Sequence, residues 1–266
     1  MRIALLYEHP AWSTALVDRM IERGVDVTPI DVGALLLPDT DFDLWVNRVN
    51  TMPSEGRPPS IVASTMHLLL TLEARGASVV NRHRCHAIGC SKAAQSALFT
   101  TIGLTTPSCV SIASPEAAVG ASGDLGFPVL TKPNIGGSGV GIVHHDSRAG
   151  LAEAVELGAV DLGIDDTGIV QEFVTSADGF VHRIESLDGQ LLYASRQKIQ
   201  DGFNYCAADG CSTGGHAIEL VQPEDALVDM ARSAVLAAGA AIASVEYLID
   251  APSGEPTSSD LHPSSN

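Results

Sequence analysis

Phe127-Pro-Val-Leu-Thr-Lys132 predicts a strand that ends in a lysine, and Gly136-Gly-Ser-Gly-Val-Gly141 follows it after three residues. A second β-like run begins at Ile142. A cation at the end of one strand, a glycine-rich loop and a second strand place backbone N–H groups and one ammonium around a polyphosphate. We therefore interpret Lys132 and the loop as a phosphate-binding site.

Better-known glycine motifs fit this segment less well. In a P-loop, G-x-x-x-x-G-K-[ST], the lysine follows the glycines, whereas Lys132 precedes them by four residues. The dinucleotide motif G-x-G-x-x-G opens a helix, but Gly137, Gly139 and Gly141 lead into β-branched residues. Protein kinases place their lysine on the strand after the glycines. The alternative is a plain hairpin with a glycine-rich turn and an exposed lysine.

The composition indicates a folded globular protein with an acidic surface. The chain has 266 residues, 45% of them apolar, which is enough to bury a substantial core. A net charge of −17 argues against nucleic acid and against anionic membranes as partners, since both attract a surplus of cations. The apolar part of residues 1–10 is too short for a signal peptide. Five cysteines without a framework spacing are typical of reduced thiols, so we expect a cytoplasmic protein.

Three stretches with different element patterns predict three domains. Residues 1–91 alternate β-like runs with helical patterns, which predicts a small parallel α/β N-terminal domain. Residues 92–174 combine a helix that begins at Lys92 with the Lys132 hairpin, which predicts a small central α+β lobe. Residues 175–266 hold a hairpin that turns at Asp188-Gly189, a helix and a last pair of strands, which predicts a second α+β lobe.

The sequence does not assign a role to several of the cysteine and histidine residues. Four of them lie close together before the helix predicted at Lys92: His83, Cys85, His86 and Cys90. Their spacing matches none of the usual pairs of zinc ligands, so we interpret the segment as a loop leading into that helix. Cys206 and Cys211 allow a role in substrate binding or redox chemistry, which their spacing does not assign.

The last predicted strand carries two polar side chains on one face. Asp260 and His262 are two residues apart, and side chains in a strand alternate between its faces. Glu246 lies on the neighbouring strand of the same predicted hairpin and can approach Asp260. A divalent ion bound to nucleotide phosphates takes oxygen ligands from one or two carboxylates, which this geometry supplies. The alternative is a solvated hairpin with ordinary polar residues.

These features follow one another in an order that covers nearly the whole chain: Ser78-Val-Val-Asn-Arg82, Lys92, Gly103-Leu-Thr-Thr-Pro107, Lys132 with its glycine loop, Gln171-Glu-Phe-Val174, Arg183, Arg196, Glu246 and Asp260. The order resembles that of the ATP-grasp superfamily, and within it the RimK-like branch of carboxylate–amine ligases. The resemblance implies a combined α/β and α+β fold of ATP-grasp architecture. In it, the N-terminal domain over residues 1–91 is followed by two lobes, 92–174 and 175–266, that sandwich ATP.

The resemblance also implies roles for single residues. Lys92 and Lys132 would hold the α- and β-phosphates of ATP beneath a loop that includes Gly136, Gly137, Ser138 and Gly139. The segment between the lobes would receive adenine, and it consists of Gln171, Glu172, Phe173 and Val174. Arg183 and Arg196 are the implied catalytic cations near the transferred phosphate. Asn204 would help to hold the triphosphate, and the implied metal ligands are Glu246 and Asp260, with His262 beside them.

Two positions depart from the family pattern. His262 stands where the family usually has Asn, and imidazole suits Mn²⁺ better than Mg²⁺. We therefore expect Mg²⁺ or Mn²⁺, unless Asn266 takes over the ligand position. Relatives place an acidic contact to the ribose just before Arg183, where this sequence has Val181-His182. Asp178 could substitute for it from the preceding turn.

The chemistry that the resemblance implies is amide formation in two steps. ATP phosphorylates a carboxylate, and an amine then attacks the acyl phosphate and expels phosphate. The expected partners are a small-molecule carboxylate and an amine, amino-acid or peptide-like, and relatives are often homo-oligomers. Two alternatives remain: a kinase on the same fold, and a nucleotide-binding protein without catalytic activity.

Overall fold

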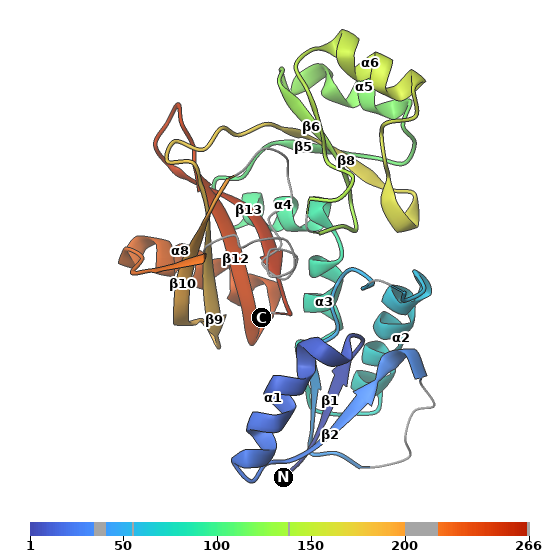
Figure 1. The fold of residues 1–266 in the computed structure, drawn as a ribbon, viewed down its shortest axis with the longest axis vertical. Coiled ribbons are helices and arrows are strands. Elements are labelled where there is room, and N and C mark those ends of the chain that lie inside the picture. The colour runs from blue at the N-terminus through green and yellow to red at the C-terminus, as the bar shows by residue number, and fades with distance from the viewer. Residues whose placement is uncertain (35–40, 55, 138, 200–217, 265–266) are drawn as a thin grey trace.

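The structure, a computed structural model, describes residues 1–34, 41–54, 56–137, 139–199 and 218–264. Within these residues the chain forms three sheets, each built from one continuous part of the sequence. In Figure 1 the first sheet lies at the lower end, the third in the middle and the second at the upper end.

The N-terminal unit is a parallel sheet covered by helices. Its strands pair in the order β2-β1-β3-β4 and comprise β1 (Arg2–Tyr7), β2 (Asp26–Asp31), β3 (Leu44–Asn47) and β4 (Val79–Val80). The helical elements are α1 (Pro10–Glu22), η1 (Val32–Ala34) and α2 (Ser60–Ala74). Residues 3–6 of β1 are buried, as expected for an apolar run at the centre of a parallel sheet. The parallel α/β fold predicted for this stretch is confirmed.

The segment before Lys92 is a helix, α3 (His83–Gly89), and not the loop that the sequence predicted. Its Cys85 and His86 are fully buried, because α3 packs against the C-terminal unit as well as against α2. Burial lowers the pKa of His86 to about 4 and raises that of the Cys85 thiol to about 12. Both side chains therefore behave as neutral core residues.

The central unit is an antiparallel sheet with helices on one face. The sheet order is β5-β8-β6-β7, with β5 (Cys109–Ile112), β6 (Val129–Pro133), β7 (Val143–His145) and β8 (Gly168–Glu172). The helical elements of the stretch are α4 (Lys92–Thr101), α5 (Ala117–Ala121), η2 (Ser122–Asp124), α6 (Arg148–Glu156) and η3 (Gly163–Asp165). Val129 and Val170 pack with Leu151 of α6 on the helix-covered face. The opposite face carries Lys132.

The C-terminal unit is a five-stranded sheet in the order β11-β10-β9-β12-β13. Its elements are β9 (Phe180–Leu187), β10 (Gln190–Lys198), β11 (Ile218–Val221), α8 (Asp225–Ala238), β12 (Ile242–Ile249) and β13 (Pro256–His262). Helices α3, α4 and α8 bury one face of the sheet around Phe99, Ile184 and Val245. Asp188 and Gly189 both have positive φ, +51° and +71°, as the predicted two-residue hairpin requires.

Asn81 joins the N-terminal unit to the C-terminal sheet. Its Nδ2 donates to the carbonyl of Ile242 at 2.7 Å and to that of Pro263, and its Oδ1 accepts from the backbone N–H groups of Ala241 (3.0 Å) and Ile242 (3.2 Å). The side chain is buried, and the backbone φ of +52° is one that Asn adopts more readily than most residues. One amide thus fixes the β4 end of the first sheet against the start of β12.

Replacing Asn81 by glycine is expected to lower the free energy of unfolding by about 2–4 kcal/mol, because buried backbone groups lose their partners at roughly 1–3 kcal/mol each. Glycine keeps the positive φ, so it tests the side-chain hydrogen bonds alone. Asn81→Ala adds the strain of a left-handed backbone, about 1–2 kcal/mol. Urea unfolding measures both variants, and a wild-type midpoint for Asn81→Gly would contradict the assignment.

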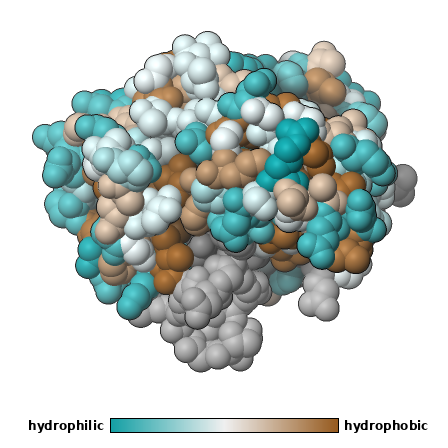
Figure 2. Space-filling view, turned by 90° about the horizontal axis from the view of Figure 1, so that it is seen from above, coloured by the Kyte–Doolittle hydropathy of each residue, from teal (hydrophilic) through white to brown (hydrophobic). Residues whose placement is uncertain are grey.

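The surface at the end where α5 and α6 lie is a mosaic of hydrophobic and hydrophilic residues (Figure 2). Such mixing is usual for a solvated protein surface. In the described part of the chain, every helix is too short or too polar to span a lipid bilayer.

Candidate functional site

The C-terminal hairpin brings the predicted metal ligands onto one face of its sheet. Glu246 of β12 lies directly opposite Asp260 of β13, and Ser244 lies opposite His262. On the other side of β12, Arg183 of β9 is the cross-strand neighbour of Glu246. Because residues opposite each other in an antiparallel pair share a face, these side chains form one polar surface.

Cations neutralise both carboxylates of this surface. Lys92 Nζ lies 2.8 Å from Asp260 Oδ1, and Glu246 Oε1 lies 3.3 Å from both Arg183 Nη1 and His262 Nε2. Burial alone would raise the pKa of Asp260, but the charges of Lys92, His262 and Lys132 lower it to about 2. The pKa of Glu246 is also below its usual value, because His262 and Arg183 outweigh burial. Both carboxylates are therefore ionised at neutral pH.

Lys132 faces these carboxylates from the central unit. Its Nζ donates to Oε1 of the buried Gln171 at 2.7 Å. Burial lowers the pKa of Lys132 to about 8, and the negative charge of Asp260 is the largest influence that opposes this shift. The ammonium therefore lies within the electrostatic reach of the C-terminal carboxylates.

The start of α4 is tied to the segment that follows Lys132. Ser91 is the N-cap of α4 and accepts a hydrogen bond from the N–H of Ala94 at 3.2 Å. Asn134 Oδ1 accepts from Ser91 Oγ and from the N–H of Ala93, each at 3.1 Å, while its carbonyl accepts from the N–H of Lys92 at 3.2 Å. These bonds fix the position of Lys92 relative to Lys132, the two lysines predicted to bind phosphate.

The glycine loop connects β6 and β7 as the sequence predicted, with Thr131 opposite Val143. A Cβ on Gly137 would lie 3.5 Å from Met52 Cε, so the loop reaches the N-terminal unit. Gly141 combines a φ of +73° with a close approach, since a Cβ there would lie 2.7 Å from Pro133 Cγ. Only glycine fits that position without a shift of its neighbours. Gly136 and Gly139 lie in the same loop, and Ser138 lies outside the described residues.

The segment between the lobes presents Phe173 next to His144. The two rings meet edge to face with centroids 4.6 Å apart. His144 lies opposite Leu130 and therefore on the same face as Lys132. Val174 is half-buried, and Glu172 is exposed, with its carboxylate accepting from the N–H of Ser108 at 3.3 Å.

Arg196 and Asp178 are not brought to the polar surface. Arg196 lies opposite His182, on the other face of the sheet from Arg183. There it pairs with Glu219 at 2.8 Å and stacks over Phe180, with its guanidinium carbon 4.3 Å from the ring centroid. Asp178 pairs with His182 Nε2 at 2.8 Å on this same side.

The predicted Asn204 lies outside the described residues, as do Cys206 and Cys211. Nothing in the described part of the chain therefore bears on their roles.

Sequence reasoning missed His144, which lies beside Phe173, and the pair Glu185 and Ser244, which adjoins the polar surface. Glu185 and Ser244 lie opposite each other on β9 and β12, one row along from Arg183 and Glu246. Both are buried. The signal was present in the strand alternation, because Glu185 is two residues from Arg183 and Ser244 is two residues from Glu246.

The donor set suits a hard divalent ion that is also bound by phosphate. In the described part of the chain, no three His, Cys, Asp or Glu side chains are arranged to hold a metal ion by themselves. Glu246 and Asp260 nevertheless present carboxylate oxygens in register on adjacent strands. Mg²⁺ is usually held by one or two carboxylates together with substrate phosphates and water, and this pair fits that requirement.

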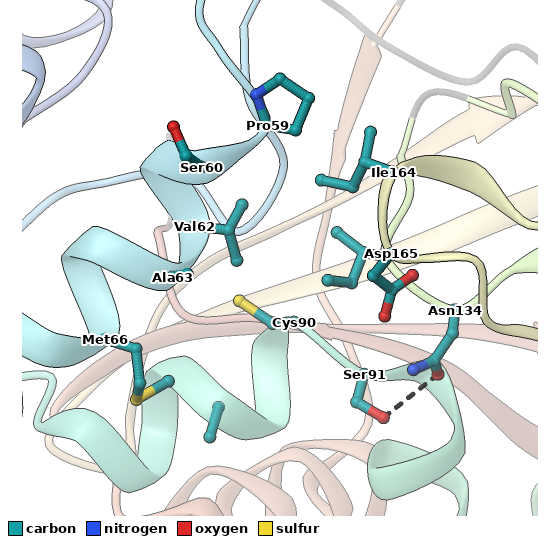
Figure 3. Close-up of a pocket in the computed structure, with 12 residues that line it drawn as sticks. Pro59, Ser60, Val62, Ala63, Met66, Cys90, Ser91, Asn134, Ile164 and Asp165 are labelled. Carbon is teal, nitrogen blue, oxygen red and sulfur yellow. Dashed lines mark hydrogen bonds between the residues drawn. The ribbon is translucent and has the colours of Figure 1, made fainter.

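A pocket of about 520 Å³ lies elsewhere, between α2, the α3–α4 junction and the segments around Asn134 and Asp165 (Figure 3). Val62, Met66 and Ile164 contribute to its mainly apolar lining. None of the residues predicted from sequence to bind nucleotide or metal lines it. An apolar pocket of this kind lacks the cations that a triphosphate requires.

Comparison with known proteins identifies the fold. No protein-family model matches the chain. The D-alanine–D-alanine ligase of Pseudomonas entomophila (strain L48) is 26% identical over 140 residues, which are 53% of this chain and 42% of that ligase. The chain spans about half the length of the curated relatives that it matches.

Solved structures resemble the chain over almost its whole length. The RimK-domain ATP-grasp protein of Sphaerobacter thermophilus DSM 20745 has a TM-score of 0.72 at 18% identity, over 98% of this chain and 90% of that chain. This chain has the ATP-grasp fold. D-cycloserine synthetase DcsG, with a TM-score of 0.72 at 15% identity, covers 99% of this chain and 92% of its own. The ATP-grasp architecture that the sequence predicted is confirmed.

Proposed function

We propose that this ATP-grasp chain is an ATP-dependent carboxylate–amine ligase, which forms an amide bond through an acyl phosphate and releases ADP and phosphate. One observation carries the proposal. Lys92 of α4 pairs with Asp260, and Lys132 of β6 lies within the electrostatic reach of Asp260 and Glu246, so that cations for phosphate lie close to carboxylates for a metal ion. Phosphoryl transfer needs this combination of positioning and charge neutralisation.

Proteins of the same fold support the nucleotide and the metal ion. The D-alanine–D-alanine ligase of Bacillus anthracis has been solved in complex with ATP, and the ATP-grasp ligase PsnB in complex with Mg and ADP. For this chain we propose ATP with Mg²⁺, and Mn²⁺ as an alternative ion because His262 adjoins the carboxylates. A small-molecule carboxylate and an amine are the proposed substrates, in the manner of the RimK-like branch.

The proposed reaction divides the work among a few side chains. Lys92 and Lys132 would bind phosphate oxygens, and Lys132 stays oriented by its hydrogen bond to Gln171. A carboxylate oxygen attacks the γ-phosphorus and ADP leaves. The amine nitrogen then attacks the acyl carbon, phosphate leaves, and the nitrogen loses a proton. Arg183, held by Glu185 at 2.7 Å, would neutralise charge on the transferred phosphate.

Glu246 and Asp260 would hold the divalent ion, which when bound neutralises negative charge on the nucleotide phosphates. Phe173 and His144 would form one wall of the adenine site, and the glycine loop would exclude water from the acyl phosphate.

A coupled assay tests the proposal. The protein is incubated with ATP and Mg²⁺ and with candidate acids and amines, separately and together, while ADP and free phosphate are measured. Release of both that requires an acid and an amine supports the ligase. ADP formation without free phosphate would indicate a kinase, and ATP binding without turnover would indicate a non-catalytic protein.

The affinity for ATP is expected to fall as the pH rises through about 8. The pKa of Lys132 is lowered to about 8 by burial, so the free protein loses this ammonium above that pH, and phosphate binding requires the charged form. The loss approaches about tenfold per pH unit, because one proton is linked to binding. Titration calorimetry with ATP between pH 7 and pH 9.5 measures the slope.

Lys132→Arg provides the control, since a guanidinium keeps its charge throughout this range. Its affinity for ATP should be independent of pH between 7 and 9.5, whatever its absolute value. Cys109 lies on the same sheet face and within the electrostatic reach of Lys132, so Cys109→Ser is introduced into both proteins to remove that influence. Equal slopes in the two proteins would refute the role of Lys132.

A further inference from the structure

Two parallel rows of side chains cross the polar face of the C-terminal sheet. The first row holds the proposed phosphate and metal residues, Arg183, Glu246 and Asp260. The second row lies two residues further along each strand and consists of Tyr193, Glu185, Ser244 and His262. Successive rows on one face are about 7 Å apart, the length of two residues in a strand.

The second row lies on the side away from the segment between the lobes. Strand β9 enters from that segment, where Ser176 bridges to Asp250, and Glu185 lies further along β9 than Arg183. At the far end, Asn81 of the N-terminal unit bonds to the backbone of Ile242, at the start of β12. A nucleotide with its base at Phe173 and its γ-phosphate at the first row therefore directs that phosphate toward the second row.

Two buried polar atoms of the second row have no partner in the described part of the chain. Glu185 is 1% exposed, and its Oε1 accepts from Arg183 Nε at 2.7 Å, but none of the described residues bonds to its Oε2. Ser244, directly opposite, is fully buried, and its Oγ also lacks a partner among these residues. Leaving such atoms unsatisfied is costly, because they have given up their hydrogen bonds to water, and the cost is larger for a charged group than for a neutral one. The pair thus offers two acceptors from which water is excluded.

Among the described residues, a cation bonds to only one of the two carboxylate oxygens of Glu185. Burial raises the pKa of Glu185, and Arg183 partly offsets the shift. Arg48, just after β3 of the N-terminal unit, is also within the electrostatic reach of Glu185. At the ends of the row, Tyr193 is 39% exposed and the His262 side chain 32%, which leaves approaches to the buried pair from either side.

We propose that Glu185 and Ser244 bind the ammonium group of the acid substrate, so that the carboxylate phosphorylated at the first row belongs to an amino acid. This inference rests on the proposed ligase function. A carboxylate at the first row and an ammonium at Glu185 are separated by no more than the row spacing, which suits an amino acid. The attacking amine must be neutral, because its lone pair forms the new bond, so an ammonium held by a carboxylate belongs to the acid instead.

The test compares acids that differ only in that group. Both enantiomers of the common amino acids, and the corresponding 2-hydroxy acids, are titrated into the wild type with Mg²⁺ and a non-hydrolysable ATP analogue. At least one amino acid should bind about tenfold or more tightly than its hydroxy analogue, and Glu185→Gln should abolish that ratio. Ser244→Ala should reduce the ratio, and Glu153→Gln, the same change on the exposed face of α6, should leave it unchanged.

The ratio of amino-acid affinity to hydroxy-acid affinity distinguishes recognition of the ammonium by Glu185 from a merely structural role of that residue. If Glu185 only orients Arg183, Glu185→Gln weakens both classes of acid equally, and the preference for ammonium survives, which overturns the inference. Binding of no amino acid to the wild type overturns it as well. Failure of the ATP analogue itself to bind would count against the ligase, whereas a bound analogue with no ammonium preference refutes only this subsite.

Discussion

Lys132→Ala is expected to abolish ATP-dependent turnover, with a loss of about 10²–10³-fold or more, the usual effect of removing one group that stabilises transferred charge. Lys132 is a half-buried cation of the central unit within the electrostatic reach of Asp260, and alanine leaves the phosphates without that ammonium. It also leaves Gln171 Oε1 without its donor. ADP release at saturating ATP measures the loss, and calorimetry separates weaker binding from slower chemistry.

Lys198→Ala is the matched control, because it removes a lysine at the exposed end of β10. Thermal unfolding of both variants shows whether they fold. A folded Lys132→Ala protein that binds and hydrolyses ATP like the Lys198→Ala protein would exclude the phosphate-binding role.

Local patterns in the sequence predicted much of the fold and part of the site. The alternation of side chains placed Asp260 and His262 on one face, and the hairpin placed Glu246 opposite Asp260, as the register shows. The helix predicted to begin at Lys92 does begin there, and it ends at Thr101. These predictions succeeded because period and turn chemistry act over a few residues.

Arg196 shows where local patterns fail. A two-residue turn at Asp188-Gly189 with unbroken pairing would place Arg196 opposite Val181, on the same face as Arg183. A β-bulge at Leu192 inserts one extra residue into β10, so that Arg196 lies opposite His182 instead. A shift of one residue moves every later side chain to the other face. No residue type in this stretch predicts the bulge.

The buried pair Glu185 and Ser244 was missed for a different reason. A glutamate on an amphipathic strand ordinarily indicates a solvated face. Here the side chain is 1% exposed and lies within the electrostatic reach of Arg48, more than 100 residues away in sequence. Burial of this kind is a tertiary effect that strand periodicity does not encode.

Asp260→Asn and Glu246→Gln together are expected to remove the dependence of nucleotide binding on Mg²⁺ and to lower turnover by about 10²–10³-fold. Both substitutions keep the side-chain shape and remove the ionised oxygens that a hard divalent ion requires. Asp260→Asn also frees Lys92 from its ion pair at 2.8 Å. Binding of ATP without metal should therefore be preserved or strengthened.

The two binding constants, for ATP alone and for Mg²⁺–ATP, are thus expected to respond differently, and this difference tests the role of the carboxylate pair. Calorimetry with ATP alone and with Mg²⁺–ATP measures both constants for the wild type, the double variant and Asp229→Asn, a control on the exposed side of α8. General loss of structure would weaken both constants together, whereas loss of the metal ligands weakens only the second. An Mg²⁺ titration of the double variant that matches the wild type would refute the assignment of Glu246 and Asp260.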